Sequence, residues 1–464
     1  MAKKINTKQV KISDIQITSD KISGRGGLFL FSEYLENTQL YKMLEKRLGF
    51  LQLSSKGLSV SQFVKQLFAH LIDNTDTAIT SFDRRKADEA YAALLGNRPE
   101  NMASSHQIKR FFRKFIFIGN EIFRAILLCL FIWRLRIEKP EFIILFGDTM
   151  VLNNDDAEKR QGVEPTYKKK KGFQPLQICW GRYMVDAIFR AGSVHSNHGD
   201  DFCKAVERLV RAIRKHYSNV PIILCTDSGF MDGDNFQFFE DELKIHYICA
   251  GKLYEDIKSY VRELPLHTFC RHNLLWQYVE FGNRLKSWST FRRAIFTTLM
   301  TDENGQLKLE FVRPDSLLYT NIGQNKELDE KLVQAGGEEY LSATKIIELN
   351  HQRGKSELVH RSIKEFAAKE QLPFSRFGMN QAYYYFLVIS HFMYEAFKHD
   401  VTYDILPIAS YPNTFRRTFI DFAVKIVSKS GKIILKVTQL VFEKLKILIL
   451  WSRCRNPIAI YALE

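Results

Sequence analysis

The sequence lacks the patterns that would place it in a membrane or in an oxidising compartment. Its seven cysteines are scattered singly, with no CxxC pair of the kind that binds zinc or exchanges disulfides. The longest apolar run spans only residues 125–133, whereas a helix that crosses a bilayer needs about 20 residues. The opening MAKKINTKQVKISDIQ has no apolar signal-peptide core. We therefore expect reduced thiols, no membrane partner and a cytoplasmic location.

Acidic residues are few relative to basic ones. The chain has 67 Lys and Arg against 52 Asp and Glu, which gives a net charge of +15, and its pI is near 9.3. This balance is unusual for a metabolic enzyme and predicts a polyanionic partner, with nucleic acid as the main candidate. A membrane-surface preference, or charge that only maintains solubility, is the alternative. The 464 residues, 45% of them hydrophobic, suffice for two or three globular domains.

The first region, residues 1–139, has the composition of a helical domain. Apolar residues recur at the helical period over residues 60–72. Ser104 begins a capping-box pattern at the start of a short basic helix, residues 105–116, which contains Arg110. This helix could enter a DNA groove as part of a helix-turn-helix, or it could be an ordinary basic surface helix.

Residues 140–251 carry strand patterns instead. Three strand-like segments precede a helix, and a strand, a helix and a strand follow, which predicts an α/β layer with central strands buried on both faces. Strands are expected within residues 141–151, 176–183, 184–194, 220–230 and 246–251, and helices over residues 200–216 and 230–245.

Two aspartates stand where strands of this layer stop. Asp148 ends the apolar run EFIILFGD, and Asp227 ends VPIILCTD. Ligands of open α/β sheets gather at the carboxyl ends of strands, so Asp148 and Asp227 are candidates for one site. Either aspartate alone would be an ordinary strand-end residue.

A third carboxylate lies in the basic stretch HQRGKSELVHRSIKEF, residues 351–366, which we predict to be helical. Steps of four, seven and eleven residues return to nearly the same helix face, so its polar and apolar residues fall on opposite sides. The polar stripe consists of Arg353, Glu357, His360 and Lys364, and the apolar side consists of Val359, Ile363 and Phe366.

Two interpretations of this stripe stay open. Arg353 and Glu357 could form an exposed i,i+4 ion pair worth a few tenths of a kcal/mol. Alternatively, Glu357 could join Asp148 and Asp227 as a metal ligand, with its basic neighbours contacting phosphate. Three carboxylates in one cleft repel one another without cations, and hard oxygen ligands suit Mg²⁺ or Mn²⁺.

These residues resemble the DDE transposases of bacterial insertion sequences. The resemblance rests on DTMV from Asp148, TDSGF at 226–230, and the spacing Asn350, two residues, Arg353, three residues, Glu357, six residues, Lys364. YKKKKGFQPL, VHSNHGD and LPFSRFGMNQAYYYFLVISHFMYEAF resemble the thirteen-eighty branch in particular, which is related to the piggyBac elements. The similarity runs from about residue 140 to 399, with a weaker match at GRGGL.

The resemblance implies a ribonuclease H-like catalytic domain that is interrupted by an insertion. Asp148 would lie on its first strand, Asp227 after its fourth strand, and Glu357 on a late helix. Residues from 276 to 299, and those after the NG turn at 304–305, read as strand-rich, which fits a β insertion. The expected regions are a helical N-terminal DNA-binding region at 1–139, the catalytic core at 140–251 and 341–399, the β-rich insertion at 252–340, and a C-terminal dimer or DNA contact at 400–464.

The resemblance also implies which residues touch DNA. Asn350 stands where the family usually has tyrosine, so the contact made by that tyrosine does not transfer directly to this chain. One of the two tryptophans Trp276 and Trp288 could stack on a flipped base, although both could instead be core residues. The expected DNA contacts are Arg353, Lys364, Asn350, Trp276, Trp288, Lys169, Lys170 and Arg110.

The implied activity is phosphoryl transfer with two Mg²⁺ or Mn²⁺ ions, held by Asp148, Asp227 and Glu357. The protein would bind the terminal inverted repeats of its element, cleave the ends and join them to target DNA. Synapsis of two ends implies a homodimer. The implied location is the bacterial cytoplasm, in association with the nucleoid. The alternatives are a catalytically silent DNA-binding relative, and a metal-dependent nuclease without strand transfer.

The C-terminal sequence predicts a β-hairpin within residues 414–437, followed by an amphipathic helix over residues 439–451.

Overall fold

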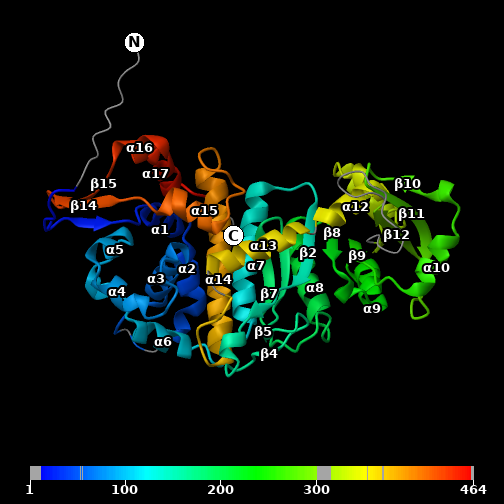
Figure 1. Ribbon diagram of the computed structural model, residues 1–464, viewed down its shortest axis with the longest axis horizontal. Coiled ribbons are helices and arrows are strands. Elements are labelled where there is room, and N and C mark those ends of the chain that lie inside the picture. The colour runs from blue at the N-terminus through cyan, green and yellow to red at the C-terminus, as the bar shows by residue number, and fades with distance from the viewer. Residues whose placement is uncertain are drawn as a thin grey trace, which may run out of the picture.

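The computed structural model describes residues 12–52, 54, 56–299, 315–352, 354–367 and 370–460. The molecule is elongated, with helices of the N-terminal region at one end, a mixed sheet in the middle, and strands β11 (Trp276–Asn283) and β12 (Arg292–Leu299) at the other end (Figure 1). Across the described ranges, no helix is long and apolar enough to cross a membrane.

Nine strands of the described chain form the central sheet, in the order β10-β11-β12-β13-β9-β8-β2-β6-β7. Strand β2 (Ile143–Thr149) pairs antiparallel with β6 (Leu176–Trp180), and β6 pairs antiparallel with β7 (Tyr183–Ile188). On its other side β2 pairs parallel with β8 (Ile222–Thr226), which pairs parallel with β9 (His246–Ala250). The predicted α/β fold is confirmed.

Helices cover this sheet on the faces that the sequence predicted to be buried. Helices α7 (Glu121–Glu138) and α8 (Asp201–His216) both pack on β7. Every residue of β7 and of β8 is buried. A short helix, α9 (Gly233–Gln237), lies between β8 and β9 as expected. Central strands of this kind carry near-continuous apolar runs because both faces are covered.

The strand-rich segment extends the same sheet. Strands β10 (Cys270–Arg271), β11, β12 and β13 (Asp315–Thr320) pair antiparallel in sequence, and β13 pairs antiparallel with β9. Helix α10 (Glu255–Glu263) precedes them. The predicted strands within residues 276–299 are confirmed, while the predicted NG turn at 304–305 lies outside the described residues.

The N-terminal region is helical, as predicted. Its third helix coincides with the apolar pattern of residues 60–72, and the capping box at Ser104 is present, with Gln107 as its partner. The basic helix ends at Arg113, three residues earlier than the predicted boundary. The helices are α1 (Gly27–Asn37), α2 (Leu40–Leu48), α3 (Val60–Asp73), α4 (Ser81–Ala87), α5 (Glu89–Leu94) and α6 (Ser105–Arg113).

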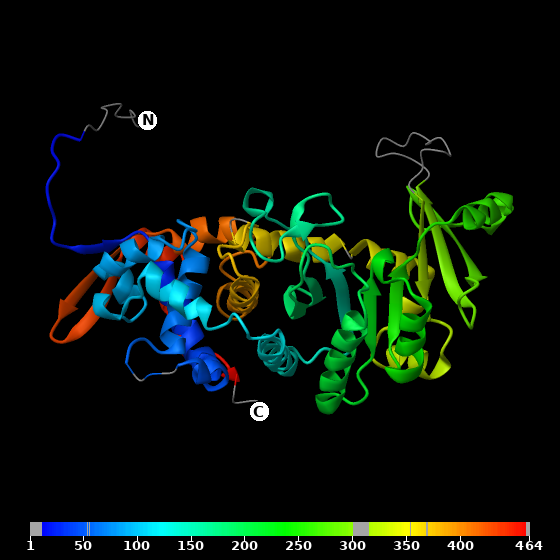
Figure 2. The same ribbon diagram turned by 90° about the horizontal axis from the view of Figure 1, so that it is seen from below.

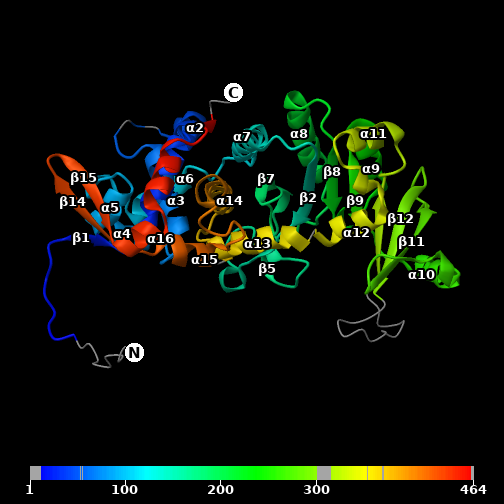
Figure 3. The same cartoon turned by 90° about the horizontal axis from the view of Figure 1, so that it is seen from above.

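Helix α14 (Phe377–Phe397) joins this helical region to the sheet. Every residue from Gly378 to Phe397 is buried, because α14 packs against α3 and α6 of the N-terminal region and against α7, β7 and α13 (Gly354–Ala367). It runs through the centre of the molecule in all three views (Figures 2 and 3). The helix that carries Glu357 is thereby anchored to the core.

The two ends of the described chain share a small sheet. Strand β14 (Val424–Lys429) forms the predicted hairpin with β15 (Lys432–Val437), and β14 also pairs with β1 (Lys21–Ser23). Our prediction of a single amphipathic helix after the hairpin is wrong. Two helices are present, α16 (Gln439–Lys444) and α17 (Ile447–Arg455), because the backbone turns at Lys446, where φ is 48°.

Candidate active site

Asp148 lies one residue before the carboxyl end of β2. Burial alternates along this strand, and Ile144, Phe146 and Asp148 share the less buried face. The Asp148 side chain is only 14% exposed, and its Oδ1 accepts a 2.7 Å hydrogen bond from the Thr149 amide. The strand thus presents one fixed carboxylate at its end.

Asp227 follows directly after β8, the parallel neighbour of β2. The register aligns Gly147 with Thr226, so the two aspartates leave adjacent strand ends. Asp227 is half-buried and caps a short 3₁₀ turn, with its Oδ1 accepting a 2.9 Å hydrogen bond from the Gly229 amide. Parallel pairing therefore brings together two residues that are far apart in the sequence.

Helix α13 supplies the third carboxylate. Its predicted apolar side is confirmed, since Val359, Ile363 and Phe366 are all buried. The helix predicted over residues 351–366 is confirmed on both sides of Arg353, since residues 351 and 352 belong to α12 (Ala343–Gln352) and residues 354–366 belong to α13. Arg353 lies outside the described residues, and its DNA contact stays a prediction.

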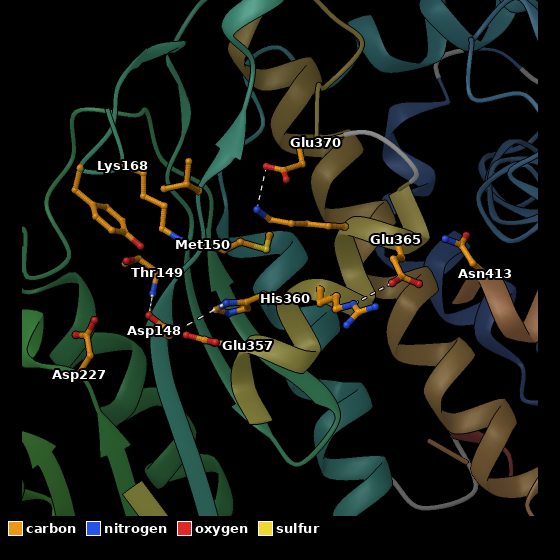
Figure 4. A pocket seen from close by; sticks show the side chains of 14 residues that line it. Asp148, Thr149, Met150, Lys168, Asp227, Glu357, His360, Glu365, Glu370 and Asn413 are labelled. Atoms are coloured by element: carbon orange, nitrogen blue, oxygen red, sulfur yellow. Dashed lines mark hydrogen bonds and ion pairs between the residues drawn. The ribbon is translucent and has the colours of Figure 1, made fainter. Parts of the chain in front are cut away.

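All three carboxylates line one pocket of about 800 Å³. Asp148, His360 and Glu357 lie near one another, and Asp227 and Lys168 reach in from the sheet side (Figure 4). The other lining residues come from the end of β2 and the residues after it, from the turn at Tyr167, from α13 and the segment after it, and from α15 (Pro412–Phe415). They are Thr149, Met150, Val151, Tyr167, Arg361, Lys364, Glu365, Glu370 and Asn413.

The donor types in this pocket suit a hard divalent cation, since carboxylate oxygens are the ligands that Mg²⁺ and Mn²⁺ prefer. In the part of the chain that the structure describes, no three His, Cys, Asp or Glu side chains are close enough together to hold a metal ion. The three carboxylates thus line one pocket and are of the right chemical type, but they are too far apart to coordinate a single ion together. Asp148, Asp227 and Glu357 remain our predicted ligands.

His360 sits beside Asp148, with its Nδ1 3.9 Å from Oδ2 of Asp148. Burial and the charges of Lys364 and Lys168 together lower the pKa of His360 to about 4, although the charge of Glu357 opposes the shift. The imidazole is therefore neutral at pH 7. Its Nε2 is buried and has no hydrogen-bond partner among the described residues.

Two lysines, Lys168 and Lys364, line the pocket together with the carboxylates. The Nζ of Lys364 lies 2.9 Å from Oε2 of Glu370, and Lys168 lines the pocket beside Tyr167. Burial raises the pKa of Tyr167, and the charges of Asp148 and Asp227 raise it further, while Lys168 opposes the shift. The Tyr167 hydroxyl thus senses both aspartates.

The lysines that we named from the same run lie elsewhere. Lys169 is exposed at a positive φ of 56°, and Lys170 pairs with Asp155 at 3.4 Å. Neither of them lines the pocket. The run YKKKKG could not reveal which lysine faces the carboxylates, because a turn has no regular side-chain period. Lys168 is the pocket-lining residue that the sequence analysis did not identify.

The two tryptophans differ. Trp288 is buried against Phe236 and Tyr319, at ring-centre distances of 5.6 and 4.8 Å. Trp276 is half-exposed, and its ring centre lies 5.2 Å from that of His351 on α12.

Two further predicted DNA contacts lie outside the pocket. Asn350 lies on α12 next to His351 and is half-buried. Arg110 is exposed on α6 and does not line the pocket. Their contacts with DNA stay predictions.

The chain matches a known protein family over most of its length. Residues 4–453 match the family described as "Transposase DDE domain group 1". The chain therefore belongs to this family, and the resemblance read from the sequence is confirmed.

Two other comparisons complete the picture. No curated protein matches the chain. One solved structure, titled a piggyBac transposase synaptic complex with hairpin DNA, is similar over 94% of this chain and 82% of its own, with 12% sequence identity and a TM-score of 0.38.

Proposed function

We propose that this protein cleaves the ends of its own mobile element and joins them to target DNA. The observation that carries the proposal is the meeting of Asp148, Asp227 and Glu357 in one pocket, from β2, the end of β8 and α13. Structural carboxylates have no reason to converge from three elements in this way, because they repel one another. Membership of the transposase family supports the same conclusion.

The catalytic part has a ribonuclease H-like arrangement in this proposal. In chain order β2, β6, β7, β8 and β9 are its five strands, and the first three are antiparallel while β8 and β9 run parallel to β2. Asp148 then lies on the first strand and Asp227 after the fourth, which agrees with the family resemblance. The strands β10 to β13 are the insertion before the helix that carries Glu357.

The side chains of the pocket divide the work of phosphoryl transfer. Asp148, Asp227 and Glu357 would hold two Mg²⁺ or Mn²⁺ ions, which would activate the attacking oxygen and offset charge on the leaving oxygen. Lys364 and Lys168 attract the DNA phosphates and lower the cost of keeping the carboxylates ionised. No covalent intermediate with the protein is required.

DNA binding follows from the charge of the chain and from the proposed contacts. A net charge of +15 favours association with a polyanion. Within the pocket Lys364 and Lys168 contact the scissile region, and Arg110 on α6 is proposed to grip the duplex further away. Synapsis of two ends requires two copies of the protein.

Strand transfer is the decisive activity. The flanking DNA of the gene should contain inverted repeats, and oligonucleotides that end in these repeats with a free 3′ hydroxyl serve as pre-cleaved ends. Incubated with Mg²⁺ and a supercoiled plasmid, the protein should join them to the plasmid. Nicking without joining indicates a nuclease, and binding of the repeats without either reaction indicates a silent relative; both results contradict the proposal.

A further inference from the structure

Residues 12–20 form an extended arm that leaves the body of the protein just before β1 (Figures 2 and 3). Its three isoleucines, Ile12, Ile15 and Ile17, are each at least 89% exposed. Within the described part of the chain, residues 12–20 hydrogen-bond with one another, and Asp20 at the end of the arm also forms a 2.7 Å ion pair with Lys425 of the same chain. Branched apolar side chains in an extended segment favour a strand that is covered on one face.

Strand β15 offers an edge to which such a segment can pair. The small sheet has the order β1-β14-β15, so β15 ends it among the described strands. Ile433 is 73% exposed on this strand, and Lys432 and Lys436 are exposed as well. An edge strand presents a row of backbone N–H and C=O groups that can pair with another chain.

Beside this edge lies an apolar pocket of about 710 Å³. Ile433, Leu435 and Val437 of β15 line one wall, and Phe442 and Trp451 of the following helices contribute to another. The pocket is large enough to take isoleucine side chains from an added strand. Both the arm and the edge thus expose apolar side chains, which would be removed from water if the two segments paired.

We propose that the arm of one copy of this protein adds as a strand to β15 of a second copy. The charges are complementary: residues 12–19 contain Asp14 and no Lys or Arg, and β15 contains Lys432 and Lys436 and no Asp or Glu. Main-chain pairing supplies affinity, and Ile15 and Ile17, which share one face of a strand, enter the apolar pocket. This interface rests on the two segments alone and not on the catalytic proposal.

The geometry of the small sheet favours exchange between copies over pairing within one chain. The arm continues from β1 at one edge, β15 is the other edge, and β14 lies between them. An arm would have to turn back across its own sheet to reach β15 of the same chain. In extended form, residues 12–20 span about 30 Å, which is long enough to pair along the full ~20 Å length of β15 in a second copy. Reciprocal exchange then closes a two-fold symmetric dimer.

The test uses full-length protein without DNA and measures molar mass by sedimentation equilibrium. The arm variant is Ile15→Lys with Ile17→Lys, and the edge variant is Lys432→Glu with Lys436→Glu. The control, Lys444→Glu with Lys446→Glu, changes the same number of charges in the adjacent helical segment. We expect a dimer for wild type and control, and dissociation constants raised ~10-fold or more for the arm and edge variants.

Mixing the two variants separates arm exchange from other interfaces. The arm variant retains an intact edge and the edge variant retains intact isoleucines, so differently tagged copies should form a heterodimer tighter than either homodimer. A monomeric wild type overturns the proposal. An arm variant that dimerises like wild type also overturns it, because it indicates β15-to-β15 pairing or a distant interface. Failure of the mixture to associate overturns it as well.

Discussion

The imidazole of His360 lies against the carboxylate of Asp148, with 3.9 Å between Nδ1 and Oδ2, and it is neutral at pH 7. The ring comes from α13 and the carboxylate from β2, so the helix of Glu357 and the strand of Asp148 lie side by side at this point. This contact does not require His360 to ionise.

We predict that His360→Ala lowers the rate of DNA cleavage about 10- to 100-fold and raises the Mg²⁺ concentration needed for half-maximal rate, because groups that orient metal ligands have effects of this size. His216→Ala, at an exposed histidine on α8, is the control and should be unchanged. Metal titrations of cleavage measure both. A wild-type metal dependence in His360→Ala would show that the ring has no such role.

Replacement of any carboxylate of the pocket should stop the chemistry. Asp148→Ala, Asp227→Ala and Glu357→Ala should each reduce cleavage by about 100-fold or more, since metal-ion stabilisation is worth several kcal/mol. Chelation of divalent ions should do the same to wild type, and Mg²⁺ or Mn²⁺ should restore activity. Gel assays with labelled ends measure the rate.

Glu365→Ala is the matched control for these variants, because Glu365 lines the same pocket but pairs with Arg361 at 3.1 Å. It should cleave DNA at close to the wild-type rate. Circular dichroism should be unchanged in all four variants. Near wild-type cleavage by any one of the three carboxylate variants removes that residue from the proposed ligand set.

DNA affinity and chemistry should separate along α13. Lys364→Ala should weaken end binding and reduce the slope of log K against log salt concentration by about one unit, because one phosphate contact is lost. Glu357→Gln should bind DNA as well as wild type, or better, since a negative charge near phosphate is removed. Fluorescence anisotropy at several salt concentrations measures both quantities.

Lys331→Ala is the control for this series, because Lys331 lies on α11 (Lys326–Gln334) in an exposed ion pair with Glu327. An unchanged salt slope in Lys364→Ala, together with normal cleavage by Glu357→Gln, would favour the interpretation that the polar stripe of α13 is only an exposed, solvated helix face.

The tryptophans should behave differently. Trp288→Ala should destabilise the fold by about 3–5 kcal/mol, as expected for a large buried side chain. Trp276→Ala should remain folded and lose ~5- to 150-fold in affinity for DNA with an unpaired base at the cleavage site, since stacking is worth about 1–3 kcal/mol. Trp276→Phe, which can still stack, should lose less. Equal cleavage by wild type and Trp276→Ala argues against stacking there.

Two buried histidines predict a loss of stability in acid. Burial lowers the pKa of both His70 and His391 to about 3, and His391 Nε2 lies 2.8 Å from the hydroxyl of Ser362. Between pH 6.5 and 3 the unfolded chain binds protons at these residues and the folded chain does not. Each histidine therefore removes about 1.4 kcal/mol of stability per pH unit as the pH falls below 6.5.

Urea unfolding at pH 7 and pH 5 measures this effect. His391→Gln should lose less stability between the two pH values than wild type, whereas His106→Gln, at an exposed position, should lose as much as wild type. Equal losses in wild type and His391→Gln would mean that this histidine is not kept neutral by the fold.

Local sequence determined much of the architecture. The order of the central-sheet strands β2, β6, β7, β8 and β9, the capping box at Ser104 and the buried side of α13 follow from periodicity and from neighbouring side chains, which depend on backbone geometry over a few residues. The short strands β3 (Leu152–Asn153), β4 (Glu164–Pro165) and β5 (Lys171–Phe173), which form a separate sheet, were not predicted. Asp148 and Asp227 could be paired from the strand pattern alone, because parallel strands meet at their carboxyl ends. The spacing from Asn350 to Lys364 indicated the family, which the comparison confirmed.

Other features depended on contacts between distant segments. Only packing made Trp288 a core residue and left Trp276 at the surface, because both lie in strand-rich sequence of similar composition. Only the tertiary structure selected Lys168 from its run and brought Glu370 to Asn153. Such contacts bring together segments far apart in the chain, as in the 3.0 Å hydrogen bond from the Asn153 amide to Glu370, 217 residues away. The sequence specifies which residues can form a site, and the packing of β2, β8, α13 and α14 decides which of them meet.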